Sequence, residues 1–306
     1  MAAYEFVTVD VFTDQRFGGN PLAVFPKADG LTDAQMQAIA REFNLSETTF
    51  VLPPDDPRNH ARVRIFTPTT EMPFAGHPNV GTGYVLANAM DTPPEHLTFE
   101  EIAGIVRVHI LRDADNRISG TRISAPRALS IGDAVPLETV AACASLFPAD
   151  FLTTAHPPLV ASVGTEFVFA EVATVEGLAR ATPDIAAFRA AGLAMGPSAS
   201  GSSLRFALML YARRDGDARK PRARMFAPLG GVLEDPATGS AGAALAALLT
   251  SIAPGQDVSL YYEIEQGIEM GRPSLLLASA RKTAEGPVTA TVAGSCVPVM
   301  RGTLEL

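Results

Sequence analysis

The chain has 306 residues and a formal net charge of −9, with 47% hydrophobic and 19% charged residues. The acidic balance argues against a nucleic-acid-binding protein, because phosphate contacts require a basic surface. A chain of this length and composition buries enough apolar surface to fold without disulfides or structural metals. The two cysteines, Cys143 and Cys296, belong to no metal-binding or redox motif, and they fit a reducing compartment.

Neither a signal peptide nor a membrane-spanning helix is expected. Residues 1–6 lack a basic region followed by an apolar stretch. The longest apolar run, 241–249, is too short to cross a bilayer. We therefore expect a soluble, cytoplasmic protein with no membrane partner and no nucleic-acid partner.

The first part of the chain mixes strand and helix patterns. Strands, in which apolar residues alternate or β-branched residues cluster, are predicted at 5–12, 22–25, 48–52 and 61–66. Phe17–Pro21 has the composition of a turn between the first two strands. Thr32 and Gln35 have the spacing of a capping box, and apolar residues follow at helical spacing, so a helix is predicted from there to about Asn44.

A second helix is predicted from Pro78 to about Asn88, because proline is well tolerated where the first NH groups of a helix lack partners. The stretch 125–157 is rich in Pro and Ala, and a domain junction is expected near 125–130. A later helix follows Pro236. Further strands are predicted at 97–100, 104–111, 117–124, 158–163, 165–172, 203–211, 222–226, 258–264, 274–280, 287–293 and 296–301. Many strands with one long helix per half favour an α+β fold over an alternating parallel sheet.

The two halves of the chain share a short repeat. Phe66–Pro68 precedes His77–Thr82 in the first half, and Phe226–Pro228 precedes Asp235–Ser240 in the second. In each copy a strand ends, a loop turns, and an X-Pro-x-x-Gly-Ser/Thr sequence starts a helix rich in small residues. This repeat makes an internal duplication plausible.

The duplication predicts two pseudo-symmetric halves. The N-terminal half, residues 1–127, carries Glu47 and His77. The C-terminal half, residues 128–306, carries Asp235, and its last strand is open to pairing with the other half.

The two repeated helix starts have the chemistry of an anion-binding site. The first NH groups of a helix lack intrahelical partners and carry the positive end of the helix dipole, which suits a carboxylate. Near these starts the sequence offers His77 and Asp235. Each has a structural alternative, because Asp before Pro is a common helix cap and His before Pro is often a structural hydrogen-bonding residue. On local grounds alone, Glu47 is a solvated side chain after a helix.

Five segments of the chain resemble, in order, the signature segments of the PhzF-like (phenazine biosynthesis) family. They are Phe17–Phe25, Asn44–Thr48, Phe66–Pro68, Ala75–Pro78 and Glu234–Ala241. The resemblance implies a diaminopimelate-epimerase-like fold with two similar halves, each a β-barrel-like sheet around a central α-helix. It also implies an active site between the halves, and a homodimer, which is common among the members.

The same resemblance implies a function and a set of site residues. The family's characterised member isomerises trans-2,3-dihydro-3-hydroxyanthranilate without a cofactor. A cofactor-independent isomerase of a small carboxylate is therefore expected, with no metal. By their positions in the family motifs, Glu47 is the general acid/base and His77 and Asp235 complete the catalytic set. Substrate-contacting positions of the family fall on Gly76, Gly239 and Ser240.

The same residues argue against a two-thiol racemase, a metal-dependent enzyme and a nucleotide-binding enzyme. Racemases and epimerases of related fold use two opposed thiols, whereas the helix starts here carry His77 and Asp235 with no cysteine nearby. The five histidines show no metal-ligand spacing, and the chain has neither a GxGxxG nor a P-loop pattern. An epimerase or other proton-transfer enzyme acting on an amino or hydroxy acid stays open, as does a non-catalytic binding protein of the same fold.

Overall fold

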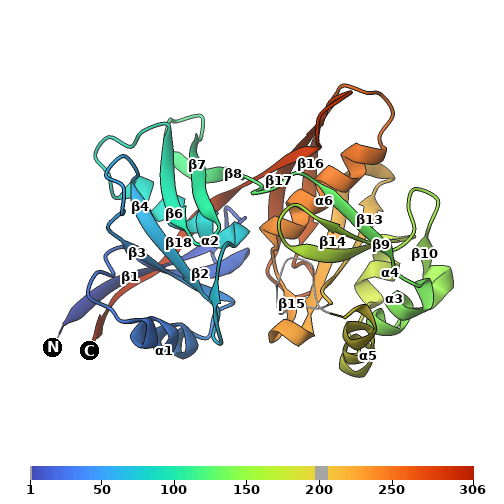
Figure 1. The fold of residues 1–306 in the computed structure, drawn as a ribbon, viewed down its shortest axis with the longest axis horizontal. Coiled ribbons are helices and arrows are strands. Elements are labelled where there is room, and N and C mark those ends of the chain that lie inside the picture. Colours follow the sequence, from blue (N-terminus) through green and yellow to red (C-terminus); the bar gives the residue numbers. More distant parts are fainter. Residues whose placement is uncertain (1, 197–205) are drawn as a thin grey trace. The chain divides into compact units, whose positions relative to one another are not determined.

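The computed structural model describes residues 2–196 and 206–306, which form two compact units (Figure 1). Unit 1 comprises Met1–Ser124 together with Ala293–Leu306, and unit 2 comprises Ala125–Val292. The chain thus changes units beside the stretch in which the junction was expected. Its last segment belongs to unit 1.

Unit 1 is a closed barrel of eight strands. They are β1 (Ala3–Val11), β2 (Asn20–Phe25), β3 (Glu47–Leu52), β4 (Ala61–Phe66), β6 (His96–Glu101), β7 (Gly104–Arg112), β8 (Ile118–Ser124) and the last part of β18 (Thr289–Glu305). From β1 to β8 the neighbours are antiparallel, except that β2 runs parallel to β3 and β4 to β6. β18 closes the ring by pairing with β1 and with β8. A short strand, β5 (Glu71–Met72), pairs with β4.

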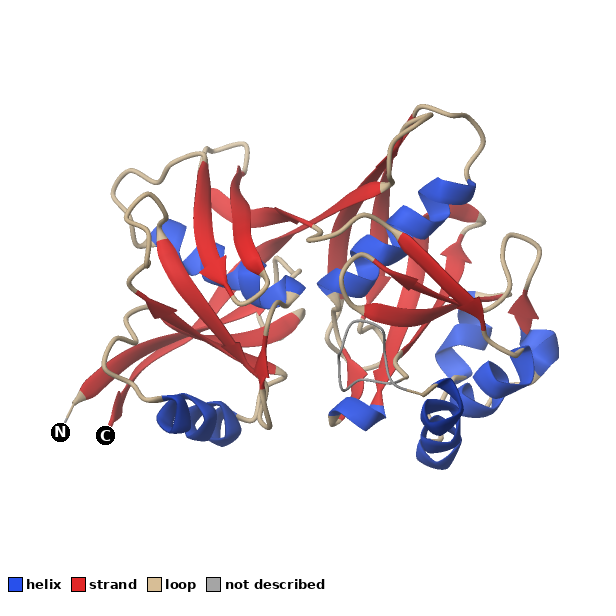
Figure 2. Ribbon diagram, viewed as in Figure 1, coloured by secondary structure: helices blue, strands red, loops and turns tan. Residues whose placement is uncertain are grey.

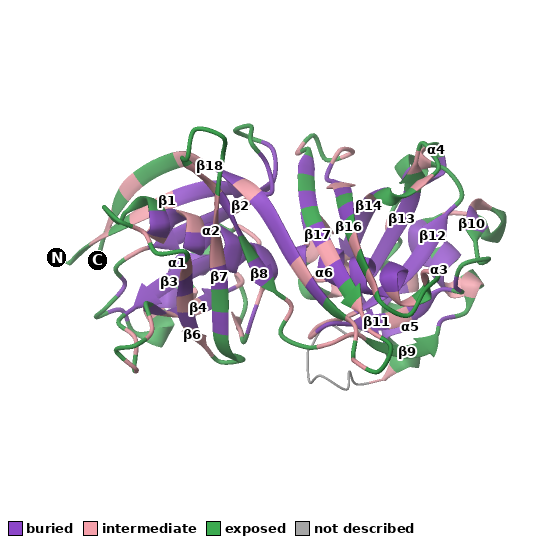
Figure 3. Cartoon of the chain, turned by 90° about the horizontal axis from the view of Figure 1, so that it is seen from above, coloured by how far each residue is buried: buried purple, intermediate pink, exposed green. Residues whose placement is uncertain are grey.

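Helix α2 (Gly76–Asn88) fills this barrel. Ten of its 13 residues are buried, and it contacts β1, β2, β3, β7 and β8. Gly81 makes the close approach possible, because a Cβ atom at this position would lie 2.6 Å from the Leu22 side chain and 2.8 Å from that of Val11. Figure 3 shows the helix as an almost uninterrupted buried segment. A helix buried all round is what its small and apolar sequence favours.

Helix α1 (Asp33–Phe43) packs against the strands from their other side. The predicted capping box is confirmed, because the Thr32 hydroxyl accepts the Gln35 N–H at 3.3 Å and the Gln35 side chain accepts the Thr32 N–H at 2.9 Å. Asn44 ends the helix in the left-handed region, with φ of 51°. The apolar face of α1 joins a hydrophobic cluster whose buried members include Phe25, Phe50, Met36, Ile39 and Phe66.

Unit 2 contains a second sheet. Its strands are β9 (Ser130–Ala134), β10 (Phe151–Leu152), β11 (Leu159–Ser162), β12 (Glu166–Val172), β13 (Leu208–Arg214), β14 (Asp217–Ala227), β15 (Val232–Asp235), β16 (Val258–Gln266) and β17 (Ser274–Lys282). The pairing runs β9–β11–β12–β13–β14–β16–β17, with β12 parallel to β13 and β14 parallel to β16. β10 pairs with β12, and β15 with β14. Residues 203–205 of the predicted strand 203–211 lie outside the described residues.

Helix α6 (Gly239–Ile252) packs on this sheet, with 11 of its 14 residues buried and with contacts to β11, β16 and β17. Three further helices cover a separate core, and none of them was predicted: α3 (Leu137–Ala144), α4 (Val175–Arg180) and α5 (Ile185–Met195). Two short 3-10 helices, η1 (Pro148–Asp150) and η2 (Pro228–Gly230), complete the unit. Strands thus outnumber helices in both units (Figure 2).

None of the helices in the described part of the chain is long and apolar enough to cross a bilayer.

Candidate active site

Glu47 is the first residue of β3 and follows the turn that ends α1. It lies level with Leu22 of the parallel strand β2. Its side chain is only 18% exposed. The left-handed residue Asn44 and the start of β3 thus bring a mostly buried carboxyl group to the edge of the barrel, where local reasoning alone would place a solvated one.

His77 is the second residue of α2 and faces this carboxyl group. Its Nδ1 lies 3.6 Å from Glu47 Oε2, beyond hydrogen-bonding distance. The residue is 4% exposed, and burial lowers its pKa to about 3, with a contact to the Pro21 backbone acting in the opposite direction. At neutral pH the imidazole is therefore uncharged beside Glu47. Its Nε2 is buried and has no hydrogen-bond partner among the described residues.

The neutral state of His77 is directly measurable. We expect its ring nitrogens to keep the shifts of a neutral imidazole from pH 8 down to about pH 5 in ¹⁵N NMR spectra, because protonation would charge a buried group. The exposed His60, which shows no such burial, is the internal comparison. A His77 resonance that titrates near pH 6.5, like an ordinary histidine, would contradict this placement.

The start of α2 has no side-chain cap. Its N-cap residue is Ala75, and Gly76 is the first helical residue, so the helix begins two residues before the predicted start at Pro78. Pro78, at the third position, has no N–H to donate. The NH groups of Gly76 and His77 are consequently the ones that helix geometry leaves without an intrahelical partner. An uncapped, buried helix start is an electropositive site, suited to an anion.

Two buried polar residues that hold loops of unit 1 were not predicted as site residues from the sequence. Asn20, which is fully buried at the start of β2, accepts a hydrogen bond from the Ser46 hydroxyl at 2.9 Å. Asp10 is 3% exposed and accepts the Phe17 N–H at 2.7 Å. Their side chains fix the loop before β2 and the turn before β3, and so they help to set where Glu47 begins its strand.

The remaining predicted residues lie in unit 2. Asp235 is the last residue of β15, opposite Met225 of β14. The structural alternative for Asp235, a helix cap, does not hold, because the N-cap of α6 is Thr238 and no side chain caps the helix. Gly239 and Ser240 are the first two residues of α6, so their NH groups have no intrahelical partner.

The register of the sequence repeat also needs correction. Gly76 and Gly239 each begin a buried helix, so the second helical position holds His77 in α2 and Ser240 in α6. The repeat had instead aligned His77 with Asp235. The repeat was aligned on its two prolines, which occupy different positions relative to their helices. Pro78 lies within α2, whereas Pro236 precedes the N-cap of α6.

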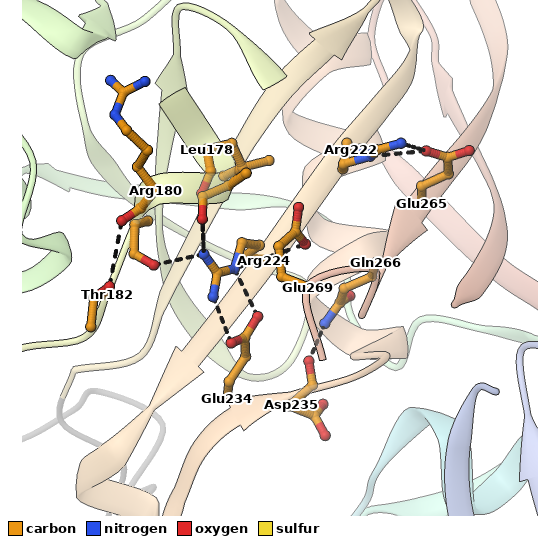
Figure 4. A network of polar contacts seen from close by, with 12 residues as sticks. Leu178, Arg180, Thr182, Arg222, Arg224, Glu234, Asp235, Glu265, Gln266 and Glu269 are labelled. Atoms are coloured by element: carbon orange, nitrogen blue, oxygen red, sulfur yellow. Dashed lines mark hydrogen bonds and ion pairs between the residues drawn. The ribbon is translucent and has the colours of Figure 1, made fainter. Parts of the chain in front are cut away.

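A polar network, shown in Figure 4, holds the chain on both sides of Asp235. Gln266, fully buried at the end of β16, donates to the Asp235 carbonyl at 2.7 Å. Arg224 forms a two-pronged ion pair with Glu234 at 2.8 and 2.7 Å. The sequence reasoning missed these residues. A signal was present for Gln266, because it continues the inward alternation of Tyr262 and Ile264 in β16.

Arg224 is itself anchored at the carboxyl end of α4. Its Nη1 donates to the carbonyl oxygens of Leu178 at 3.2 Å, Ala179 at 3.2 Å and Ala181 at 2.6 Å. Its side chain is 7% exposed, and that of its partner Glu234 is 13% exposed. The pair therefore ties β15 to β14 and α4 in a poorly hydrated place.

Removal of this arginine should be strongly destabilising. We expect Arg224→Met, which preserves much of the side-chain volume, to lower the free energy of unfolding by about 3–5 kcal/mol, because it leaves a buried carboxylate without a partner. Equilibrium urea denaturation measures this. Arg58→Met is the matched control, since the Arg58–Asp56 pair lies on the surface, and it should leave the urea midpoint unchanged. Equal midpoints for the two variants would contradict the role given to Arg224.

Within the part of the chain that the structure describes, no three His, Cys, Asp or Glu side chains gather in a way that could hold a metal ion.

The fold defines the class of protein. The crystal structure of a PhzF-family phenazine biosynthesis protein from Bacillus anthracis matches with a TM-score of 0.86 and 25% identity, covering 100% of both chains. A hydroxyproline epimerase from Agrobacterium vitis matches with a TM-score of 0.60 and 14% identity, covering 99% of this chain and 92% of that one. The mixed α/β architecture with its closed eight-stranded barrel is thus that of PhzF-like and epimerase-like proteins.

The sequence comparisons narrow this class. Residues 9–302 match the family model described as phenazine biosynthesis-like protein. Trans-2,3-dihydro-3-hydroxyanthranilate isomerase from Pseudomonas fluorescens is 37% identical over 310 residues, covering 99% of this chain and 100% of that protein. The chain belongs to the phenazine biosynthesis-like family and is an isomerase of the PhzF-like type.

Proposed function

We propose that this isomerase moves a proton between two carbon atoms of a small carboxylate substrate without a cofactor, with Glu47 as the general acid/base. The observation that carries the proposal is the pairing of Glu47 with His77, 3.6 Å apart, beside the uncapped start of a buried helix. Trans-2,3-dihydro-3-hydroxyanthranilate, the substrate named for the Pseudomonas fluorescens relative, is the first candidate.

In the proposed reaction, the ionised Glu47 takes a proton from an activated carbon. The electron pair of the broken C–H bond moves into the conjugated system of the substrate. The resulting Glu47 carboxylic acid then gives the same proton to another carbon on that face, and the electrons shift back. Atoms and charge balance with no oxidation or reduction. Because the side chain is only 18% exposed, the acid exchanges its proton with water slowly enough for this return.

The neighbouring groups have supporting roles in this proposal. The uncharged His77 donates a hydrogen bond where negative charge develops, without bringing a positive charge that would hold Glu47 as a carboxylate. The free NH groups at the starts of α2 and α6, those of Gly76, Gly239 and Ser240, bind the substrate carboxylate. Asp235 holds a polar group of the same substrate.

We also propose that the two units descend from one duplicated element. The order of pairing supports this, because β2–β3–β4–β6–β7 in unit 1 and β12–β13–β14–β16–β17 in unit 2 alternate parallel and antiparallel pairs identically. In each unit a short strand, β5 or β15, leads into the buried helix. Under this proposal Gly76 and Gly239 are equivalent residues, each at the start of the buried helix of its unit. The homodimer and the cytoplasmic location stay predictions.

An epimerase acting on an amino or hydroxy acid is the second candidate, favoured by the shared fold. A two-thiol version of it finds no support in the structure. Cys143 and Cys296 are both buried, and burial raises the pKa of both thiols, that of Cys143 to about 12. Neither thiol would provide a thiolate base at neutral pH.

The test is turnover followed by NMR in deuterated water. We expect the protein to convert trans-2,3-dihydro-3-hydroxyanthranilate, or a close dihydroaromatic acid, and to show no exchange at the α-carbon of a panel of amino and hydroxy acids. Deuterium exchange into one of those acids, with no reaction of the dihydroaromatic acid, would reverse the preference between the two candidates.

A further inference from the structure

The turn from Asp235 to the start of α6 is fastened by a single side-chain amide. Gln266 Oε1 accepts the Thr238 N–H at 3.1 Å. Gln266 Nε2 donates to the Asp235 carbonyl at 2.7 Å and to the Thr238 hydroxyl at 3.2 Å. Both N–H groups of the Gln266 amide and one lone pair of its oxygen are therefore used inside this turn. Because the Thr238 N–H can only donate, the amide atom that faces it must be the oxygen.

These bonds orient the Thr238 hydroxyl. Because its oxygen accepts from Gln266, its own proton is available to a neighbour, and the neighbour is Asp235 Oδ2, with which it makes a short hydrogen bond. These two hydrogen bonds, from the Gln266 amide to the Thr238 hydroxyl and from that hydroxyl to the Asp235 carboxylate, are called the relay below. In both of them the donated proton points toward Asp235. Donation to an ionised oxygen stabilises the carboxylate over the carboxylic acid and restricts its rotamer.

The backbone around the relay is held independently. Glu234, the residue before Asp235, is paired with the anchored Arg224. Gly267, the residue after Gln266, has a φ of 74°, and a Cβ atom there would lie 2.7 Å from the Pro236 carbonyl oxygen. A side chain at 267 would thus push the two loops apart. The absence of one lets Gln266 reach the turn.

The relay also leaves the helix start open. The Thr238 N–H is directed to Gln266, and the Gly242 N–H bonds to the Thr238 carbonyl at 2.8 Å as the first bond of α6. Between them lie Gly239, Ser240 and Ala241, whose NH groups have no intrahelical partner. Thr238 occupies the N-cap position, but its hydroxyl donates a hydrogen bond to Asp235 and does not cap the helix. This is a departure from the ordinary use of threonine there.

We infer that Gln266 and Thr238 are positioning residues for Asp235, which hold its carboxylate ionised and in one orientation. The inference rests on the proposed function, in which Asp235 contacts the substrate. Neither residue touches the reacting atoms. Their effect is expected on kcat and on its pH dependence, not on the binding of the substrate carboxylate.

Thr238→Val removes the hydroxyl and keeps the shape. It should lower kcat about tenfold or more, the scale of a hydrogen bond to a charged group, with KM unchanged. The acidic limb of the pH–rate profile should move to higher pH, because Asp235 loses a donor to its ionised form. Thr238→Ser, which keeps the hydroxyl, should restore both. Thr250→Val, which removes another buried α6 hydroxyl, one bonded to Tyr262, is the matched control and should retain wild-type kcat.

Comparing Asp235→Asn with Thr238→Val separates the positioning role of Thr238 from the proposed role of Asp235 in substrate binding. Asp235→Asn with wild-type turnover would refute the role of Asp235 in the proposed function. An inactive Asp235→Asn together with Thr238→Val of wild-type kcat and unshifted acidic limb would overturn the positioning role alone. Circular dichroism and thermal unfolding establish that each variant folds. If Thr238→Val does not fold, Thr238→Ala takes the same measurements, because it removes the hydroxyl without placing a methyl group where the oxygen was.

Discussion

Replacing Glu47 by glutamine should lower kcat by at least about a hundredfold, the scale on which a general base contributes to catalysis. The amide keeps the size and the hydrogen-bonding shape of the carboxyl group but does not accept a proton at neutral pH. The fold should tolerate the change, because Glu47 begins a strand and its side chain keeps some exposure. Steady-state kinetics with the proposed dihydroaromatic substrate measures the effect, and KM should change far less than kcat.

Two variants make this result specific. Glu47→Asp keeps the carboxylate but withdraws it by one methylene, so it should retain more activity than Glu47→Gln. Glu42→Gln, at an exposed position on α1 close by in the chain, removes a carboxylate of the same kind and should be fully active. Near-normal turnover by Glu47→Gln would remove Glu47 from the mechanism.

The second large effect concerns stability and comes from Glu101, at the end of β6. Neither of its carboxyl oxygens is accessible, and neither has a hydrogen-bond partner among the described residues. Burial raises the pKa of Glu101 to about 8, and the nearby Asn79 amide offsets only part of this. The folded protein therefore keeps a proton on Glu101 that the unfolded chain releases above its ordinary pKa of 4.5. Stability must fall as pH rises between these two values.

Glu101→Gln removes this penalty, because glutamine has no proton to lose. The variant and the wild type should be similarly stable near pH 4.5. Between pH 5 and 8 the advantage of the variant should grow by up to about 1.4 kcal/mol per pH unit. Urea denaturation of both proteins across this range measures the difference. Because both proteins keep His77, whose lowered pKa destabilises the fold as pH falls below 6.5, that contribution cancels in the comparison.

The adjacent Glu100 is the matched control. It accepts the N–H groups of Asp55 at 2.7 Å and Asp56 at 2.8 Å, and these bonds, together with a larger contribution from the Asn59 side chain, lower its pKa. Glu100→Gln should therefore be less stable than wild type by a constant amount from pH 5 to 8, because Glu100 is ionised in both the folded and the unfolded state above its ordinary pKa of 4.5. A constant difference between Glu101→Gln and wild type from pH 5 to 8 would show that Glu101 ionises normally in the folded protein.

The parts of the fold that depend on local sequence were predictable. The capping box of Thr32 and Gln35 and the strand alternation of unit 1 need only neighbouring residues, and the elements there match the expected ranges closely. The helices α3, α4 and α5 were missed. α3 lies inside a Pro- and Ala-rich stretch that composition assigned to a junction, and its left-handed terminus at Ser145 has no glycine to mark it. Such helices are stabilised by packing on a shared core more than by their own sequence.

In the candidate site, too, the features that depend on local sequence were predictable and those that depend on distant contacts were not. No periodicity links Glu47 to His77, which are 30 positions apart in the chain; their proximity depends on a barrel closing around α2, and only the family resemblance put them together in advance. The repeat predicted two helix starts, and the structure has both. The structural alternative for Asp235 fails, because an Asp before a proline looks like a helix cap, while this side chain bonds to Thr238. The alternation of β16 marks Gln266 as inward-facing, but spacing does not reveal the partners that Gln266 and Arg224 reach on other strands.

The most direct measurement is a crystal structure with a stable substrate analogue such as 3-hydroxyanthranilate bound. We expect Glu47 within reach of a ring carbon, His77 and Asp235 on polar groups of that same molecule, and the analogue's carboxylate on the NH groups of Gly76, Gly239 or Ser240. A bound analogue that contacts neither Glu47 nor Asp235, in crystals of protein that turns over the substrate, would contradict it.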